Sequence, residues 1–185
     1  VSEFTNDSES GKYILSLPAG KNYGIAVKSE GYLFHSENFD IPESAGFREY
    51  EKIIYLKKIK KGESIVLRNI FFDLDKFSLK SESKTELDRL IKLLKDNPDL
   101  RIEISGHTDS RGSAKYNQSL SENRSKAVVD YLVANGNFPT ERFEYKGYGE
   151  QKLIHSDQDI SKMKVEKDQE EAHSENRRTE FKILE

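Results

Sequence analysis

The chain has 185 residues, which is enough for one ordinary domain or two small ones. Hydrophobic residues make up 35% and charged residues 34%, so we expect a compact core under a heavily charged surface. Its 30 basic and 33 acidic residues nearly balance, which argues against nucleic acid as a partner because such binding needs a basic face. The chain has no cysteine, which excludes disulfides and cysteine-based zinc sites. It also has no run of about 18 apolar residues, so the sequence predicts no transmembrane helix.

The first 57 residues predict β structure. Turn signals at residues 18–20 and 30–31 separate short runs of apolar and aromatic residues. The expected strands are residues 13–17, 23–27, 33–34, 39–41 and 53–56. Four or five strands are few for a closed sandwich. The chain also opens at Val1, with neither a preceding strand nor a signal peptide. We therefore expect a truncated β-sandwich, cut or processed from a longer protein.

The pattern changes after a cationic linker at residues 58–62. Ser83 and Glu86 have the spacing of a capping box at the start of a helix. The expected elements are a buried strand over 65–72, a helix from 83 to 97, a strand at 102–104, a helix ending at 135–136, and strands at 143–145 and 181–183. Strands that alternate with helices predict an α+β domain with helices packed on a sheet. Residues 151–175 are polar, and their pattern does not decide between a helix and a loop.

A polar loop bounded by glycines, residues 106–112, follows the predicted strand at 102–104. Polar groups at the carboxyl end of a strand are well placed to meet a ligand. An ordinary turn, in which Thr108 and Asp109 satisfy local backbone donors, explains the same residues. Taken by itself, this loop sequence favours an ordinary turn over a ligand-binding site.

Arg124 is the second indication of a site. Residues Leu120, Arg124, Val128 and Leu132 follow one another at intervals of four, so Arg124 falls on the apolar stripe of its helix. A guanidinium there needs a partner or must reach water, because an unpaired buried charge is costly. A local carboxylate is one answer. The other is a pocket shared with Asp109, which suits a zwitterion: the carboxylate on Arg124 and the ammonium on Asp109.

Several motifs in this part of the chain closely resemble, in the same order, the OmpA-like C-terminal domain, a family that includes peptidoglycan-associated lipoproteins, porin tails and flagellar stator anchors. The motifs are Phe72-Asp73-Leu74-Asp75, Gly106-His107-Thr108-Asp109, the run 116–124, Gly147-Tyr148-Gly149-Glu150 and Asn176-Arg177-Arg178-Thr179-Glu180-Phe181. The resemblance covers about residues 63–185, and the matching order and spacing make it specific.

The resemblance implies a β-α-β-α-β-β domain that binds peptidoglycan at the end of the stem peptide. In the family, the aspartate matching Asp109 takes the ammonium of diaminopimelate and the arginine matching Arg124 takes the adjoining carboxylate. The resemblance assigns further residues to the wall of the pocket: Phe72, Asp73, Asp75, His107, Thr108, Asn117, Leu120 and one of Arg177 and Arg178. The chain departs from the family at Ala172-His173-Ser174, where a short Gly-Arg-Ala loop is usual, so the resemblance does not decide which of the two late arginines faces the pocket.

A specificity follows from this assignment. Lysine in a stem peptide has the amine but lacks the neighbouring carboxylate, so it would leave Arg124 without a partner. That loss is roughly 1–3 kcal/mol, and we expect diaminopimelate-type walls to be preferred.

Residues 1–57 resemble the later part of a carboxypeptidase-regulatory-like β-sandwich, through 11–13, 17–20, 23–27 and 31–32. Such a domain followed by an OmpA-like domain over 63–185 is similar to outer-membrane-associated proteins of Bacteroidetes, one of them a type IX secretion accessory protein. The architecture implies a periplasmic anchor that holds an envelope assembly and its other proteins to the wall. It implies no cofactor.

Two other classes of protein compete with this interpretation. An enzyme would need a metal on His107 and Asp109, completed by Asp73, Asp75 or His155, but the chain lacks a His-Glu-x-x-His helix, a Gly-x-Ser-x-Gly elbow and a cysteine nucleophile. No twelve-residue calcium loop follows Asp73 either. We therefore expect a binding protein and not an enzyme. The alternative is a protein-interaction module of the envelope, with the β-sandwich as its docking face.

Overall fold

The computed structural model describes residues 4–7, 9–43, 49–73 and 76–184. Two compact units divide the chain. The smaller consists of Val1–Ile25 and Asn38–Ile53, and the larger of Ala26–Glu37 and Ile54–Glu185. The chain therefore leaves the smaller unit after residue 25 and re-enters it at residue 38.

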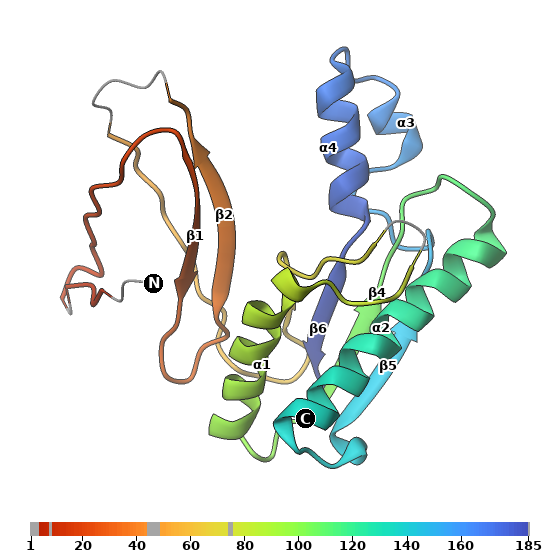
Figure 1. The fold of residues 1–185 in the computed structure, drawn as a ribbon, viewed down its shortest axis with the longest axis horizontal. Coiled ribbons are helices and arrows are strands. Elements are labelled where there is room, and N and C mark those ends of the chain that lie inside the picture. The colour runs from red at the N-terminus through yellow and green to blue at the C-terminus, as the bar shows by residue number, and fades with distance from the viewer. Residues whose placement is uncertain (1–3, 8, 44–48, 74–75, 185) are drawn as a thin grey trace. The chain divides into compact units, whose positions relative to one another are not determined.

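A two-stranded sheet runs through the N-terminal part, made of β1 (Lys21–Val27) and β2 (His35–Ile41) (Figure 1). Tyr23 and Phe39 pack across it with ring centroids 6.0 Å apart. The strands expected at 13–17 and 53–56 are wrong, since neither segment is a strand. Ile14 is 96% exposed and Ile53 66% exposed, so these apolar residues have no core to bury and no partner strand to hold them.

The larger unit contains a mixed four-stranded sheet in the order β3-β6-β4-β5. β4 lies parallel to β5 and antiparallel to β6, and β3 is antiparallel to β6. The strands are β3 (Ser64–Val66), β4 (Ile102–Gly106), β5 (Phe143–Gly147) and β6 (Thr179–Ile183). This sheet with its helices confirms the predicted α+β class.

The first strand of this sheet is shorter than predicted. Only Ser64–Val66 pairs with β6, and the chain leaves the sheet after Leu67, whose N–H donates to the carbonyl of Thr179 at 2.8 Å. Further along, Phe72 makes a single bridge with Leu79. β6 has five residues, so its ladder ends before residues 69–72 can join it.

Helix α1 (Lys84–Asp96) follows the short helix η1 (Ser81–Ser83) and buries Leu87, Leu90, Ile91 and Leu94 against the sheet core. The predicted capping box is wrong. The Ser83 hydroxyl instead pairs with the backbone of Phe71, at 2.8 Å to its N–H and 3.1 Å to its carbonyl. Glu86 is buried and accepts a hydrogen bond from Ser36 at 2.7 Å, because residues 26–37 pack on this helix.

Helix α2 (Ala114–Gly136) lies along β4 and β5 (Figure 1), and its first half meets their carboxyl ends. It begins at Ser113, whose hydroxyl accepts from the N–H of Tyr116, and ends at Asn137, which has a left-handed backbone. A Cβ on Gly106 would lie 2.2 Å from the Ser121 carbonyl oxygen, and one on Gly147 would lie 2.4 Å from the N–H nitrogen of Glu122. Glycine in both strands therefore lets the helix backbone touch the sheet at the level where the polar loop starts.

The polar stretch over 151–175, which the sequence left open, holds α3 (Asp157–Ile160) and α4 (Glu166–Asn176). The short helix η2 (Thr140–Arg142) precedes β5. The buried Asn176 anchors the stretch, because its Oδ1 accepts from the N–H groups of Ile154 at 2.7 Å and His155 at 3.0 Å. α4 therefore ends beside the start of β6, close to the polar loop. None of the described helices is long and apolar enough to cross a membrane.

Candidate functional site

The polar loop after β4 is pinned from both sides. The N–H of His107 donates to the carbonyl of Arg178 at 3.0 Å, and the N–H of Thr108 donates to the carbonyl of Gly149 at 2.9 Å. These two partners precede β6 and follow β5, the neighbours of β4 in the sheet. The loop therefore continues the sheet by two residues. Asp109, which is only 5% exposed, follows directly at the carboxyl end of β4.

Two arginines hold the carboxylate of Asp109. Arg111 contacts its Oδ2 through Nε at 2.8 Å and Nη2 at 2.6 Å, and Arg177 contacts the same oxygen through Nη1 at 2.7 Å. The other oxygen, Oδ1, accepts only the N–H of Arg111, at 3.2 Å, among the bonds found in the described residues. From the sequence, we expected this carboxylate to pair with the ammonium of a ligand. In the structure it already pairs with two arginines of the chain.

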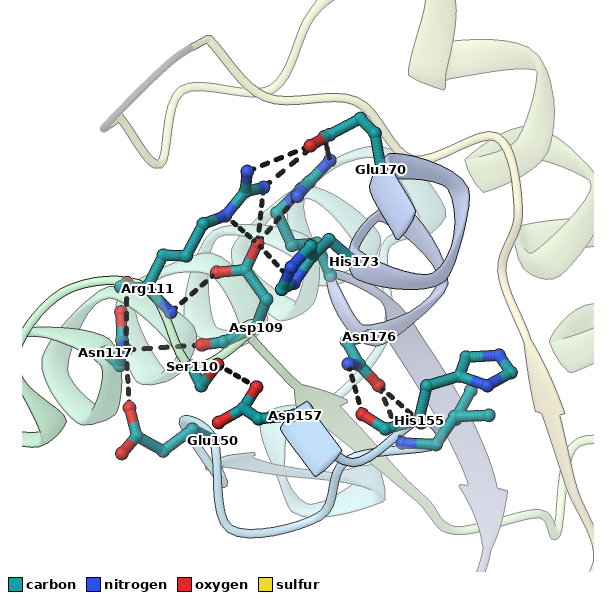
Figure 2. A network of polar contacts seen from close by, with 12 residues as sticks. Asp109, Ser110, Arg111, Asn117, Glu150, His155, Asp157, Glu170, His173 and Asn176 are labelled. Carbon is teal, nitrogen blue, oxygen red and sulfur yellow. Dashed lines mark hydrogen bonds and ion pairs between the residues drawn. The ribbon is translucent and has the colours of Figure 1, made fainter. Parts of the chain in front are cut away.

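Glu170 on α4 closes these contacts into a ring (Figure 2). It accepts from Nη1 and Nη2 of Arg111 at 2.9 and 3.3 Å, and from Nη2 of Arg177 at 2.9 Å. The four-charge ring, as we call it, consists of Asp109, Arg111, Glu170 and Arg177 and carries no net charge. It ties the loop after β4 to the end of α4.

The pKa values in the ring favour its charged form. Burial alone would raise the pKa of Asp109, but the hydrogen bonds and charges of Arg111 and Arg177 together outweigh it and hold that pKa below the ordinary 3.8. Hydrogen bonds from the same arginines lower the pKa of Glu170. Asp109 is therefore ionised at neutral pH, as an ammonium-binding residue must be.

Unpaired polar atoms lie beside Asp109. Nδ1 of His173, on α4, is 3.9 Å from Oδ2 of Asp109. This nitrogen and the hydroxyl of Thr108, which is 3% exposed, are buried without a hydrogen-bond partner among the described residues. Buried polar atoms without partners are uncommon, and a site that receives a polar ligand is one reason for them.

Arg124 is half-buried on α2 and contacts the segment before α1. Its Nε donates to the carbonyl of Lys76 at 3.0 Å, and its Nη2 donates to the carbonyl of Asp73 at 3.4 Å. Its guanidinium also lies over the ring of Phe72, 5.0 Å from the centroid. The structure thus brings Phe72 and the backbone of Asp73 next to Arg124. Asp75 lies outside the described residues.

Asn117 links the Asp109 cluster to the helix that carries Arg124. Its amide donates to the carbonyls of Asp109 and Arg111, both at 3.3 Å, and to Glu150 at 2.7 Å. Arg124 follows seven residues later, which places it on the same face of α2 and about 10 Å along the axis. Leu120 lies between them on that face and is partly buried.

The two late arginines face different ways. Arg177 joins the four-charge ring, whereas Arg178 pairs with Glu180 and donates to the carbonyl of Lys152 at 3.1 Å. The geometry therefore favours Arg177 at the pocket. His107 lies beneath the loop, 3% exposed and stacked on Tyr148 at 5.3 Å between ring centroids. Burial, and then the charge of Arg178, lowers the pKa of His107 to about 4, so it is a neutral supporting residue.

Sequence reasoning missed three residues of the site: Arg111, Glu170 and His173. Arg111 could have been suspected, because it is a cation two residues from Asp109 inside the glycine-bounded loop. Glu170 and His173 lie in the stretch that showed no clear periodicity, and only the end of α4 brings them to Asp109. In the described ranges, no group of three or more histidine and acidic side chains is arranged to hold a metal ion.

The fold and the loop together define a mixed-sheet α+β domain with a charged site at the carboxyl end of its central strand. The chain belongs to the OmpA family, whose family model matches residues 71–167. This confirms the resemblance expected for the second part of the chain. The site residues Glu170, His173 and Arg177 lie beyond the matched range.

Two relatives agree with this assignment, and one solved structure has a similar fold. The chain is 39% identical over 92 residues to the peptidoglycan-associated lipoprotein of Rhizobium meliloti, covering 50% of this chain and 52% of that protein. It is 40% identical over 84 residues to outer membrane protein A of Serratia marcescens, covering 44% of this chain and 23% of that protein. The fold is similar to the cell wall anchor of the type VI secretion system of Pseudomonas aeruginosa, with a TM-score of 0.51, 22% identity, and 65% of this chain and 78% of that one covered. The chain thus spans about half or less of these two relatives.

Proposed function

We propose that this protein binds peptidoglycan without a covalent bond, through the free end of diaminopimelate in the stem peptide. The observation that carries the proposal is Asp109, which is buried, ionised and fixed at the end of β4 in a chain of the OmpA family. The names of a peptidoglycan-associated lipoprotein and of a cell wall anchor among its similar proteins support it. Its chemistry is binding and not catalysis.

In this proposal Asp109 accepts the ligand ammonium and Arg124 donates to the adjoining carboxylate. Two of the groups that Arg124 contacts are the neutral backbone carbonyls of Lys76 and Asp73, and a carboxylate is a stronger acceptor that can take two parallel bonds. Phe72 lies against its guanidinium and limits the geometries it can adopt. Asp73, Asp75, His107, Thr108, Asn117, Leu120 and Arg177 complete or support the pocket. Arg178 supports it only indirectly, by its backbone bond to the loop.

We further infer that the protein works in the periplasm, where it anchors an outer-membrane-associated assembly and its other envelope proteins to the wall. Residues 1–57 would be part of a carboxypeptidase-regulatory-like β-sandwich, 58–62 a linker and 63–185 the wall-binding domain, in a Bacteroidetes-type architecture that serves type IX secretion. Exposed apolar residues in the N-terminal part, Ile14, Tyr50 and Ile53, favour a second role there as a docking face for an envelope protein.

Calorimetry with a purified muropeptide that carries a free diaminopimelate end tests the binding site. We expect the wild-type chain to bind and both Asp109→Ala and Arg124→Ala to lose at least about tenfold in affinity, since each leaves a ligand charge without its partner. Circular dichroism checks that both variants are folded. Wild-type affinity in both folded variants, or no binding by the wild type, would contradict the proposal.

A further inference from the structure

Asp109 has no vacant position for an ammonium at its more heavily bonded oxygen. Oδ2 receives Arg111 at 2.6 and 2.8 Å and Arg177 at 2.7 Å, and His173 lies 3.9 Å away. A ligand ammonium that binds there must displace one of these groups. If the ligand binds as in the proposed function, on which this inference rests, one of these groups must leave.

We infer that Arg111 is an internal competitor of the ligand: its guanidinium occupies the ammonium position on Asp109, and the ligand must displace it. The Arg111 side chain is 52% exposed, against 33% for Arg177 and 18% for His173. It projects from a loop that Gly112, with a φ of +106°, turns sharply. Arg177 is tied more firmly, since its backbone joins α4 to β6. Arg111 is therefore the cation that can leave at the smallest cost.

The four-charge ring allows this exchange without leaving a charge unpaired. When an ammonium replaces Arg111 on Asp109, Arg111 keeps its two bonds to Glu170, and Arg177 keeps its bond to Asp109. The side chains of Glu170 and Arg111 are 56% and 52% exposed, so the displaced pair can move outward together. The ligand gains its contact with Asp109 at the cost of the Arg111–Asp109 contact, so we expect a modest affinity at each site.

The competition predicts an unusual mutational result: removal of a cation from the site should tighten binding. We expect Arg111→Gln to bind the diaminopimelate muropeptide about twofold to fivefold more tightly than wild type, the range of one partly exposed ion pair. Arg111→Lys keeps the charge but cannot make the paired Nε and Nη2 contacts, so a smaller gain is expected. Lys115→Gln is the matched control, because Lys115 is an exposed cation four residues away and the change in net charge is the same.

A second probe separates competition for the ammonium from other effects. The same muropeptide with its diaminopimelate amine acetylated lacks the ammonium, so Arg111→Gln should give no gain with it. Calorimetry on the full chain, with wild type and Asp109→Ala measured alongside, provides all these affinities. A gain for Arg111→Gln, absent from Lys115→Gln and from the acetylated probe, supports the inference.

The remaining outcomes overturn one claim or both. Suppose that wild type binds, Asp109→Ala does not, and folded Arg111→Gln binds equally or more weakly than wild type. This result overturns the competitor role and leaves the proposed function intact. Arg111 would then be a ligand contact or a structural clamp. No binding by wild type overturns the proposed function and this inference with it.

Discussion

Asp109 keeps its charge in a buried position, which the proposed ammonium contact requires. Burial makes its charge costly, and the guanidinium groups of Arg111 and Arg177 compensate for that cost. The carboxylate is thus kept ionised and oriented, and a ligand meets a charge that is already desolvated. The same pairing explains why removing Asp109 should affect the protein as well as its binding, since two arginines would lose their partner.

His107 supplies a test of the packing beneath the loop. The pKa of His107 is lowered to about 4 in the folded chain, first by burial and then by Arg178, while an unfolded histidine titrates near 6.5. Between these values the unfolded chain binds more protons, so stability is lost as the pH falls from about 6.5 towards 4. Relative to His107→Gln, we expect wild type to lose an additional 2–3 kcal/mol, roughly, between pH 7 and pH 4.

Urea unfolding followed by circular dichroism at pH 7, 5.5 and 4 measures this difference. Glutamine keeps a polar side chain but does not titrate in this range, so it is the appropriate reference. Parallel loss of stability in the two proteins would show that His107 is not held neutral by its surroundings.

At the scale of elements, contact between α2 and the sheet ends fixes the site. The atom that approaches Gly106 is the backbone carbonyl oxygen of Ser121, which cannot move aside as a flexible side chain could. We expect Gly106→Ala to destabilise the domain by about 1–3 kcal/mol, because a Cβ 2.2 Å from this oxygen forces the helix off the strand. The helix carries Asn117 and Arg124, so muropeptide binding should fall as well.

Chemical unfolding and calorimetry on Gly106→Ala check both effects, with Asn123→Ala, on the exposed face of α2, as the control. Unchanged stability together with unchanged affinity would mean that α2 can move away from β4 without disturbing the loop.

The elements also show what the sequence could and could not predict. Both long helices and the central strands were predictable from the spacing of their apolar residues. Leu87, Leu90 and Leu94 recur at helical spacing, and Ile102 and Ile104 alternate as in a strand. The strands at 13–17 and 53–56 were not, since alternation predicts a strand only where a partner and a core exist. Likewise, the long-range ladder between β4 and β6 brings Arg177 to Asp109, and local sequence carries no sign of that pairing.

At the scale of the whole molecule, the proposed role is that of an anchor with weak individual sites. A small polar pocket contacts few ligand atoms, and the ligand displaces an existing ion pair, so affinity per site should be modest. Many copies that face one wall polymer would still hold firmly, because each bound copy raises the effective concentration for the next.

The proposed site pairs both charges of a zwitterion, so its ligand should need a carboxylate as well as an ammonium. Calorimetry should compare two muropeptides that differ only in the third residue of the stem, diaminopimelate in one and lysine in the other. We predict that the diaminopimelate form binds at least about tenfold more tightly, because the lysine form offers Asp109 an ammonium but offers Arg124 no carboxylate. Equal affinity for the two muropeptides would contradict the account.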